Sequence, residues 1–326
     1  RERFRFARGN KILWGTRSGP WYSRGMKSFA DVIAGARKLG TRRFVVAQAA
    51  DPVVLEAVEA ARREGFCAPV LVGVRDEIES AAREAGVALD GHRLVAVAAK
   101  ADAAAAAVRL VATGEGDVLV KGLLQTSELL KPVLDKATGL GRGRLVSHVG
   151  VFIVPGFDRF VLVTDAALCI APDLSQKADI VRNAFETARG LGIADPVAAI
   201  LCAVETVNPK MPATTDAAEL VKMAESGAIA GGRVVGPLAL DGAVDPEAAR
   251  HKGIANPLAG RADILVAPDI EAGNVLYKSL TCFARAEVAG ILVGARAPIV
   301  VTSRSDSAAG KLHSMALAVL CAAAPG

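Results

Sequence analysis

The chain has 326 residues, is 52% hydrophobic but only 4% aromatic, and carries a formal net charge of +5. Residues 1–25 hold seven of the 39 basic residues and one of the 34 acidic ones, which leaves 32 basic and 33 acidic residues in the body. These values exclude a disordered chain and a disulfide scaffold, and they provide no basic nucleic-acid surface on the body.

Residues 1–25 show neither helical nor alternating apolar spacing, and the regular pattern begins at Met26. We therefore expect this segment to be a dispensable tail or a non-native N-terminal extension. No two of the five cysteines lie within three residues of each other, and the apolar stretches are too short to span a bilayer. These features favour a cytoplasmic protein without a membrane partner.

Short apolar runs alternate with amphipathic stretches through the first half of the chain. The predicted strands here are 43–47, 68–73, 93–97 and 117–121. The predicted helices are 51–65, 77–86, 101–113 and 127–137. This alternation is typical of a parallel, doubly wound sheet, in which ligands bind beyond the carboxyl ends of the strands.

The middle of the chain breaks this rhythm, because two apolar runs, 149–154 and 159–164, are separated only by a short Pro-Gly loop that predicts a hairpin. The strands predicted after the hairpin are 197–204, 233–240, 263–266 and 299–302. The helices predicted there are 174–189, 216–225, 246–252, 273–284 and 308–321. The expected fold class is α/β, with two doubly wound three-layer domains, 26–149 plus 299–326 and 150–298, and an active site in the cleft between them.

Polar residues follow several of the predicted strands. The first group, Lys121, Gln125 and Thr126, comes after the strand DVLV. A second lies in the segment TSRSDS (302–307), where free N–H groups at a helix start, hydroxyls and an arginine favour anion binding. The others are Asp241 after one strand, and Asp269, Asn274 and Lys278 after another. Each of these residues is equally consistent with a helix cap or a turn.

Several common functional motifs are absent from the sequence. It contains no P-loop, no GxGxxG after a strand and no GxSxG elbow. The four histidines do not pair at metal-ligand spacing, so no metal site is predicted, and a structural role is the simpler interpretation for each.

Four segments in order, KGLLQTSELLKPVL, GPLALDGA, PDIEAGNVLYKSL and TSRSDS, resemble the phosphate acetyltransferase/phosphate butyryltransferase family. The resemblance covers the chain from about Met26 onwards, and TSRSDS and DIEAGNVLYKSL are more similar to the butyryltransferase branch. It implies an architecture similar to that of isocitrate and isopropylmalate dehydrogenases, and commonly a homodimer. It also implies reversible transfer of a butyryl or acetyl group between coenzyme A and inorganic phosphate, without a bound cofactor.

The resemblance also assigns roles to residues. Ser303 and Arg304 match the family's Ser-Arg pair at the reacting centre, and Lys131 falls where acetyltransferases often carry an arginine. The acetyltransferase branch has an acidic base a few residues after that pair, at a position occupied here by Gly310. Asp306 is the nearest acidic residue and is the substitute candidate for the base.

Two other function classes remain open from the sequence. A non-catalytic paralogue that binds coenzyme A or acyl phosphate is favoured by the glycine at position 310. A metal-dependent hydroxy-acid dehydrogenase is disfavoured, because no DxxxD pair occurs in a suitable loop. A turnover assay separates the first alternative from the transferase.

Overall fold

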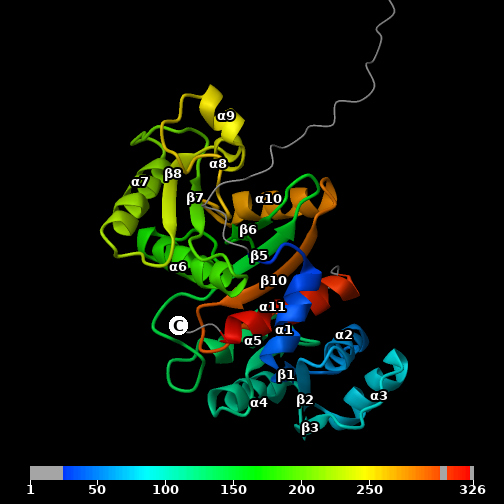
Figure 1. The fold of residues 1–326 in the computed structure, drawn as a ribbon. Coiled ribbons are helices and arrows are strands. Elements are labelled where there is room, and N and C mark those ends of the chain that lie inside the picture. Colours follow the sequence, from blue (N-terminus) through cyan, green and yellow to red (C-terminus); the bar gives the residue numbers. More distant parts are fainter. Residues whose placement is uncertain (1–24, 302–306, 324–326) are drawn as a thin grey trace, which may run out of the picture.

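The computed structural model describes residues 25–301 and 307–323 (Figure 1). Its strands are β1 Arg42–Ala47, β2 Cys67–Gly73, β3 Arg93–Ala96, β4 Val118–Lys121, β5 Ser147–Ile153, β6 Phe160–Thr164, β7 Val197–Leu201, β8 Arg233–Leu238, β9 Ile264–Val266, β10 Glu287–Val293 and β11 Ile299–Val300. Its helices are α1 Phe29–Leu39, α2 Pro52–Arg63, α3 Arg75–Ala85, α4 Lys100–Ala112, α5 Thr126–Val133, α6 Leu174–Gly190, α7 Pro212–Glu225, α8 Leu240–Val244, α9 Pro246–His251, α10 Ile270–Cys282 and α11 Ala308–Ala323. All the predicted strands and helices are present, and α1, α8 and β10 add to them.

Helix starts follow the capping chemistry of the sequence. The Asp51 side chain accepts hydrogen bonds from the N–H groups of Val53 and Val54, and Pro52 occupies the first turn of α2. Ser28 and Asp31 form a reciprocal capping box at the start of α1. These local contacts fix where each helix leaves the preceding loop.

One sheet of eleven strands runs through the part of the chain that the structure describes, in the order β3-β2-β1-β4-β11-β10-β5-β6-β9-β7-β8. β3, β2, β1, β4 and β11 are parallel to one another, and so are β6, β9, β7 and β8. Three antiparallel pairings in the centre, β11–β10, β10–β5 and β5–β6, join the two parallel sets. The two parallel sets therefore run in opposite directions.

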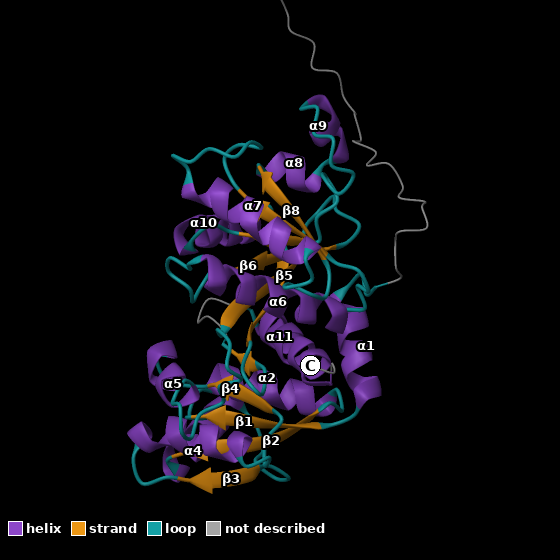
Figure 2. Ribbon diagram, turned by 90° about the vertical axis from the view of Figure 1, so that its left-hand side faces the viewer, coloured by secondary structure: helices purple, strands orange, loops and turns teal. Residues whose placement is uncertain are grey.

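Helices cover both faces of this sheet and make three layers (Figure 2). On one face a continuous apolar core joins α1, α2, α3, α6, α7 and α11 to strands from both parallel sets. On the other face the apolar residues form two separate clusters, which we call the α4–α5 core and the α8–α10 core. The sheet is thus packed throughout on one face and interrupted on the other.

The expectation of two separate sheets requires a correction, since β5 and β10 unite the strands into a single sheet. β5 pairs with β10 along its whole length, from Ile153 opposite Glu287 to Ser147 opposite Val293. β10 was not predicted, because Gly290 interrupts its apolar run and Gly294 directly follows it, a pattern that suggests a loop. The predicted hairpin is confirmed, because β5 and β6 are antiparallel neighbours.

Candidate active site

The carboxyl ends of the two parallel sets approach the same line across the sheet from opposite sides. β4 ends at Lys121 and β6 ends at Thr164. Val300 lies opposite Val120, so Val301 lies level with Lys121. Ile299 pairs with Leu292, so Val301 lies level with Gly290. Gly290 pairs with Gly150, and Gly150 pairs with Val163. We call this line, Lys121–Val301–Gly290–Gly150–Val163, the central row.

The central row crosses the second face at the boundary between its two apolar clusters, because Val301 packs on the α4–α5 core and Val163 belongs to the α8–α10 core. Successive residues of a strand point to opposite faces. On β5, Val149 and Val151 belong to the continuous core, so His148 and Gly150 point to the other face. By the same alternation Gly290 points there between Val288, which packs on the α8–α10 core, and Leu292, which belongs to the α4–α5 core. This boundary between the two cores is the candidate site.

Two ring side chains lie over the glycine pair. A Cβ on Gly150 would lie 2.9 Å from Cε2 of Tyr277, which comes from α10. A Cβ on Gly290 would lie 2.9 Å from Nε2 of His148 and 3.8 Å from the Tyr277 hydroxyl. The two ring centroids are 5.8 Å apart, and Tyr277 also meets Phe152 edge-on at 4.9 Å. Glycine at both positions leaves space that a Cβ atom would take from the two rings.

Asp165, which sequence reasoning missed, organises the turn after β6. It is only 3% exposed, and its Oδ2 accepts a hydrogen bond from the His148 N–H at 2.7 Å. Its Oδ1 accepts from the N–H groups of Ala167 and Leu168, both at 2.8 Å. A buried carboxylate that receives three N–H groups is well compensated. The signal for Asp165 was available, since it directly follows the buried strand FVLVT.

The predicted residues after β4 lie at the start of α5. Lys121 is half-buried at one end of the central row, and its Nζ donates to the carbonyls of Gly122 and Leu124 at 3.3 and 3.1 Å. Gln125 is exposed and forms the helix cap with Glu128, while Thr126 is the first residue of α5. Lys131 is exposed on the last turn of the same helix.

The predicted residues of α10 meet the turn that holds Asp165. Asp269 caps the helix by accepting the N–H of Ala272 at 2.9 Å. Nδ2 of the exposed Asn274 donates to the carbonyl of Ala166 at 3.1 Å. Lys278 is exposed, with its Nζ 5.4 Å from the Tyr277 ring centroid. Asn274 and Lys278 therefore lie beside the turn after β6 and beside Tyr277, respectively.

Asp241 lies away from this cluster. It follows β8, the last strand of the sheet, and six strands separate β8 from β4. Lys252 donates to Asp241 at 2.6 Å and to Glu205 at 2.8 Å. The hydrogen bond from Lys252 holds the pKa of Asp241 below its ordinary value. The structure thus places Asp241 in an ion-pair network and does not bring it together with Lys121.

The predicted catalytic residues Ser303, Arg304 and Asp306 lie outside the described residues, between Val301 and Ser307. Ser307 is the residue before α11, and its Oγ accepts the N–H of Gly310 at 3.1 Å. That bond identifies Ser307 as the cap of α11. Capping of α11 therefore does not require Ser303 or Arg304.

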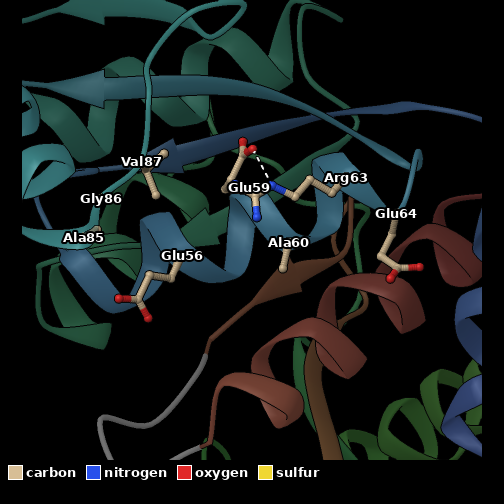
Figure 3. A pocket seen from close by; sticks show the side chains of 8 residues that line it. All are labelled: Glu56, Glu59, Ala60, Arg63, Glu64, Ala85, Gly86 and Val87. Carbon is tan, nitrogen blue, oxygen red and sulfur yellow. Dashed lines mark hydrogen bonds and ion pairs between the residues drawn. The ribbon is translucent and has the colours of Figure 1, made fainter.

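Three cavities open elsewhere on the described surface, and none has the central row in its lining. The cavity in Figure 3, about 360 Å³, lies between α2 and the end of α3. Its carboxylates are largely paired, Glu59 with Arg62 and Arg63, and Glu64 with Arg37. The other two cavities, about 250 and 390 Å³, share Arg296 and Pro298 and lie at the amino ends of β4 and β11.

Residues 25–301 and 307–323 contain neither a metal-binding cluster nor a membrane-spanning helix. No group of three or more His, Cys, Asp or Glu side chains within them is arranged to hold a metal ion. No helix there has the length and apolar character required to cross a membrane.

Comparisons with known proteins agree on one family. The family model described as "Phosphate acetyl/butaryl transferase" matches residues 95–319. The chain is 46% identical to a phosphate butyryltransferase of Clostridium acetobutylicum over 91% of this chain and 99% of that protein. It is 47% identical to a phosphate acetyltransferase of Rhizobium meliloti over 90% of this chain and 92% of that protein.

Solved structures give the same grouping. A branched-chain phosphotransacylase from Enterococcus faecalis has a TM-score of 0.77 and 36% identity, covering 87% of this chain and all of that one. A putative 4-hydroxythreonine-4-phosphate dehydrogenase from Salmonella typhimurium has a TM-score of 0.56 at 12% identity, with 86% of this chain and 99% of that one covered. This second likeness concerns the fold alone.

Proposed function

Because the chain belongs to the phosphate acetyl/butyryl transferase family, it is an acyltransferase that moves a short acyl group reversibly between coenzyme A and inorganic phosphate, and we propose that the central row is where this reaction takes place. One observation carries the location. The carboxyl ends of both parallel sets meet at the central row, at the boundary between the α4–α5 core and the α8–α10 core. In open α/β sheets, ligands bind beyond such strand ends.

The reaction requires the coenzyme A thiolate to attack the acyl-phosphate carbonyl while phosphate leaves. Ser303 and Arg304 follow Val301 of the central row by two and three residues. In the proposal the Arg304 guanidinium holds the phosphoryl group, because its forked donors suit phosphate geometry. Ser303 supplies a hydrogen bond that strengthens as charge develops on the carbonyl oxygen. Lys131 supplies a second positive charge, and Asp306 stays a candidate base.

The other predicted residues are proposed to hold the substrates at the rim. Lys121, Gln125 and Thr126 stand on the side of α5, and Asn274 and Lys278 on the side of α10. Figure 2 shows α5 and α10 on the same side of the sheet, on either side of its centre.

We propose that the acyl group is butyryl or propionyl rather than acetyl. The support is the likeness of TSRSDS and PDIEAGNVLYKSL to the butyryltransferase branch. Overall identity does not decide the matter, since relatives of both names are equally similar. One methylene in an apolar pocket is worth about 1–3 kcal/mol, so we expect a modest preference.

The decisive experiment incubates the full chain with coenzyme A and acetyl, propionyl or butyryl phosphate, and follows thioester formation by its ultraviolet absorbance. We expect turnover with all three, the highest kcat/KM for butyryl or propionyl phosphate, and no loss in the presence of a chelator. A protein that binds coenzyme A without turnover would instead be the non-catalytic paralogue. A clear acetyl preference would reverse the choice of acyl group.

Further features of the molecule belong to the same proposal. We divide the chain into one domain of residues 26–149 plus 299–326 and another of 150–298, each built on one parallel set of strands, with the site in the cleft between them. β11, which pairs with β4, supports this discontinuous arrangement. We also propose a homodimer in the cytoplasm, and the five free cysteines suit a reducing compartment. Light scattering on the purified chain measures the oligomeric state.

A further inference from the structure

The glycine pair of the central row leaves room for one polar side chain to lie against the row. Gly150 and Gly290 are direct cross-strand partners at the boundary between the two cores. Directly paired residues have their Cβ atoms about 5 Å apart, so ordinary side chains at both positions would fill this space. A Cβ at 290 would instead meet Nε2 of His148 at 2.9 Å, closer than carbon and nitrogen pack. The pair therefore accommodates an imidazole lying across the row.

The backbone of His148 is fixed on both sides. Its N–H donates to Asp165 at 2.7 Å, and its carbonyl accepts the Thr164 hydroxyl at 2.8 Å. The residue itself is 6% exposed. The backbone from which the imidazole projects is therefore fixed before a substrate approaches, which favours proton transfer from a defined position.

The other three histidines do not face the central row. His92 lies 3.5 Å from Glu59 of α2, and His313 stacks on Phe29 at 4.2 Å. His251 is exposed at the end of α9. His148 is thus the one histidine of the chain at the proposed site.

From this geometry we propose that His148, in place of Asp306, is the general base of the acyl transfer, a role that rests on the proposed function. Nε2 of His148 takes the proton of the coenzyme A thiol, and the thiolate forms the new carbon–sulfur bond at the acyl carbonyl. The carbon–oxygen bond to phosphate breaks, and the leaving phosphate takes the proton back from the imidazolium. Atoms and charge balance, because acyl phosphate and thiol become thioester and hydrogen phosphate.

This assignment fills the position left open by Gly310, where the acetyltransferase branch has its acidic base. Histidine is the side chain used most often as a general base. Among the described residues, the titratable groups nearest to His148 are Asp165 after β6 and Tyr277 and Lys278 on α10. Tyr277 is a positioning residue, because its ring lies beside the imidazole over the glycine pair.

The test compares the pH dependence of kcat/KM in the wild type, His148→Gln and the control His251→Gln. We expect the wild type to reach a plateau above about pH 7 and His148→Gln to be about 100-fold slower at that pH. Without the base, the variant depends on thiolate formed in solution, so its rate should keep rising with pH towards the thiol pKa. His251→Gln should match the wild type.

A second variant moves the imidazole without removing it. Gly290→Ala should lower kcat with little change in the KM for acyl phosphate, while Gly141→Ala, whose added Cβ meets nothing within 4 Å, should be silent. Circular dichroism confirms that each variant is folded, and added imidazole should partly restore His148→Ala. If His148→Gln is folded and keeps the wild-type pH profile of kcat/KM, the base assignment is overturned, whatever the rate of the variant. Absence of thioester formation by the wild type would instead defeat the proposed function.

Discussion

At the amino end of β4, Asp117 receives three hydrogen bonds from Arg43 of β1. The Arg43 N–H and Nε reach Oδ2 at 2.7 and 3.0 Å, and a terminal guanidinium nitrogen reaches Oδ1 at 2.6 Å. The Arg43 side-chain hydrogen bond is the largest cause that holds the pKa of Asp117 below its ordinary value. This carboxylate is therefore more stable ionised in the folded protein than in the unfolded chain.

Asp117→Asn should lower the free energy of unfolding by about 1 kcal/mol at pH 7. Because the folded-state pKa is lowered, the contribution is complete above the unfolded value of about 3.9 and is lost as the pH falls through the folded value. Urea denaturation at pH 7 and pH 3 should therefore show a gap that shrinks in acid. The control Glu247→Gln, whose ion pair with Arg250 spans 3.7 Å at the surface, should change little. An equal gap at both pH values would contradict this interpretation.

Ser303 and Arg304 allow a sharp separation of catalysis from capping, since the structure assigns the α11 cap to Ser307. Ser303→Ala and Arg304→Ala should each lower kcat by about 10²–10³-fold. Arg304→Lys should remain impaired, because a point charge does not replace the guanidinium fork. Ser307→Ala should cost about 1 kcal/mol of stability and leave kcat near the wild-type value. Normal turnover in both Ala variants would remove these residues from the mechanism.

At the scale of elements, the amino end of α10 is seated on the turn after β6. Gly273 is the one residue of α10 that is buried, and a Cβ there would lie 2.2 Å from the carbonyl oxygen of Asp165. Asn274 adds its hydrogen bond to Ala166. The helix that carries Tyr277 and Lys278 is therefore positioned by contact with the turn that also holds His148.

Gly273→Ala should destabilise the protein by about 2 kcal/mol, although alanine is the better helix former. The reason is that the added Cβ meets backbone that has no room to move away. Gly190→Ala, at the end of α6, is the matched control, because its added Cβ finds only ordinary contacts at 3.6 Å and should be neutral or slightly stabilising. Urea midpoints of both variants decide the sign, and a stabilised Gly273→Ala would show that α10 is not seated as described.

At the scale of the whole molecule, the continuous core joins both parallel sets of strands. It includes Phe44 of β1 and Val234 of β8, and α6 and α11 pack against it together. The two parts proposed as domains therefore share a core on one face, and are separate only on the face that carries the central row. This arrangement couples their stability while leaving the site open.

The shared core should make thermal unfolding a single cooperative transition. Calorimetric and van't Hoff enthalpies should then agree, and far-ultraviolet circular dichroism should follow the same curve. Two resolved transitions would show that the parts unfold independently, as two domains with separate sheets would. Light scattering should be measured at the same protein concentration, because dissociation of a dimer makes the midpoint of thermal unfolding depend on concentration.

Local patterns predicted the individual elements well, and the reason is visible in particular segments. The run FVVA of β1 is buried on both faces, and Asp51-Pro52 provides the cap and first turn of α2. The run EVAGILV of β10 was not predicted as a strand, because its glycine makes room for His148 and Tyr277, which lie outside the run. A sequence pattern of ten residues gives no information about such neighbours.

The sequence by itself determined the alternation of strands and helices, the hairpin at β5 and β6, the absence of common nucleotide and metal motifs, and the family resemblance. Only the tertiary structure decided that there is one sheet rather than two, that Asp241 belongs to an ion-pair network, and that Asp165 and His148 stand at the centre. The physical reason is the distance along the chain between the residues that are in contact. Helix caps and apolar spacing are contacts within one or two turns, whereas the central row is set by strand pairings such as that of Gly150 with Gly290, which are distant in the chain and adjacent in the sheet.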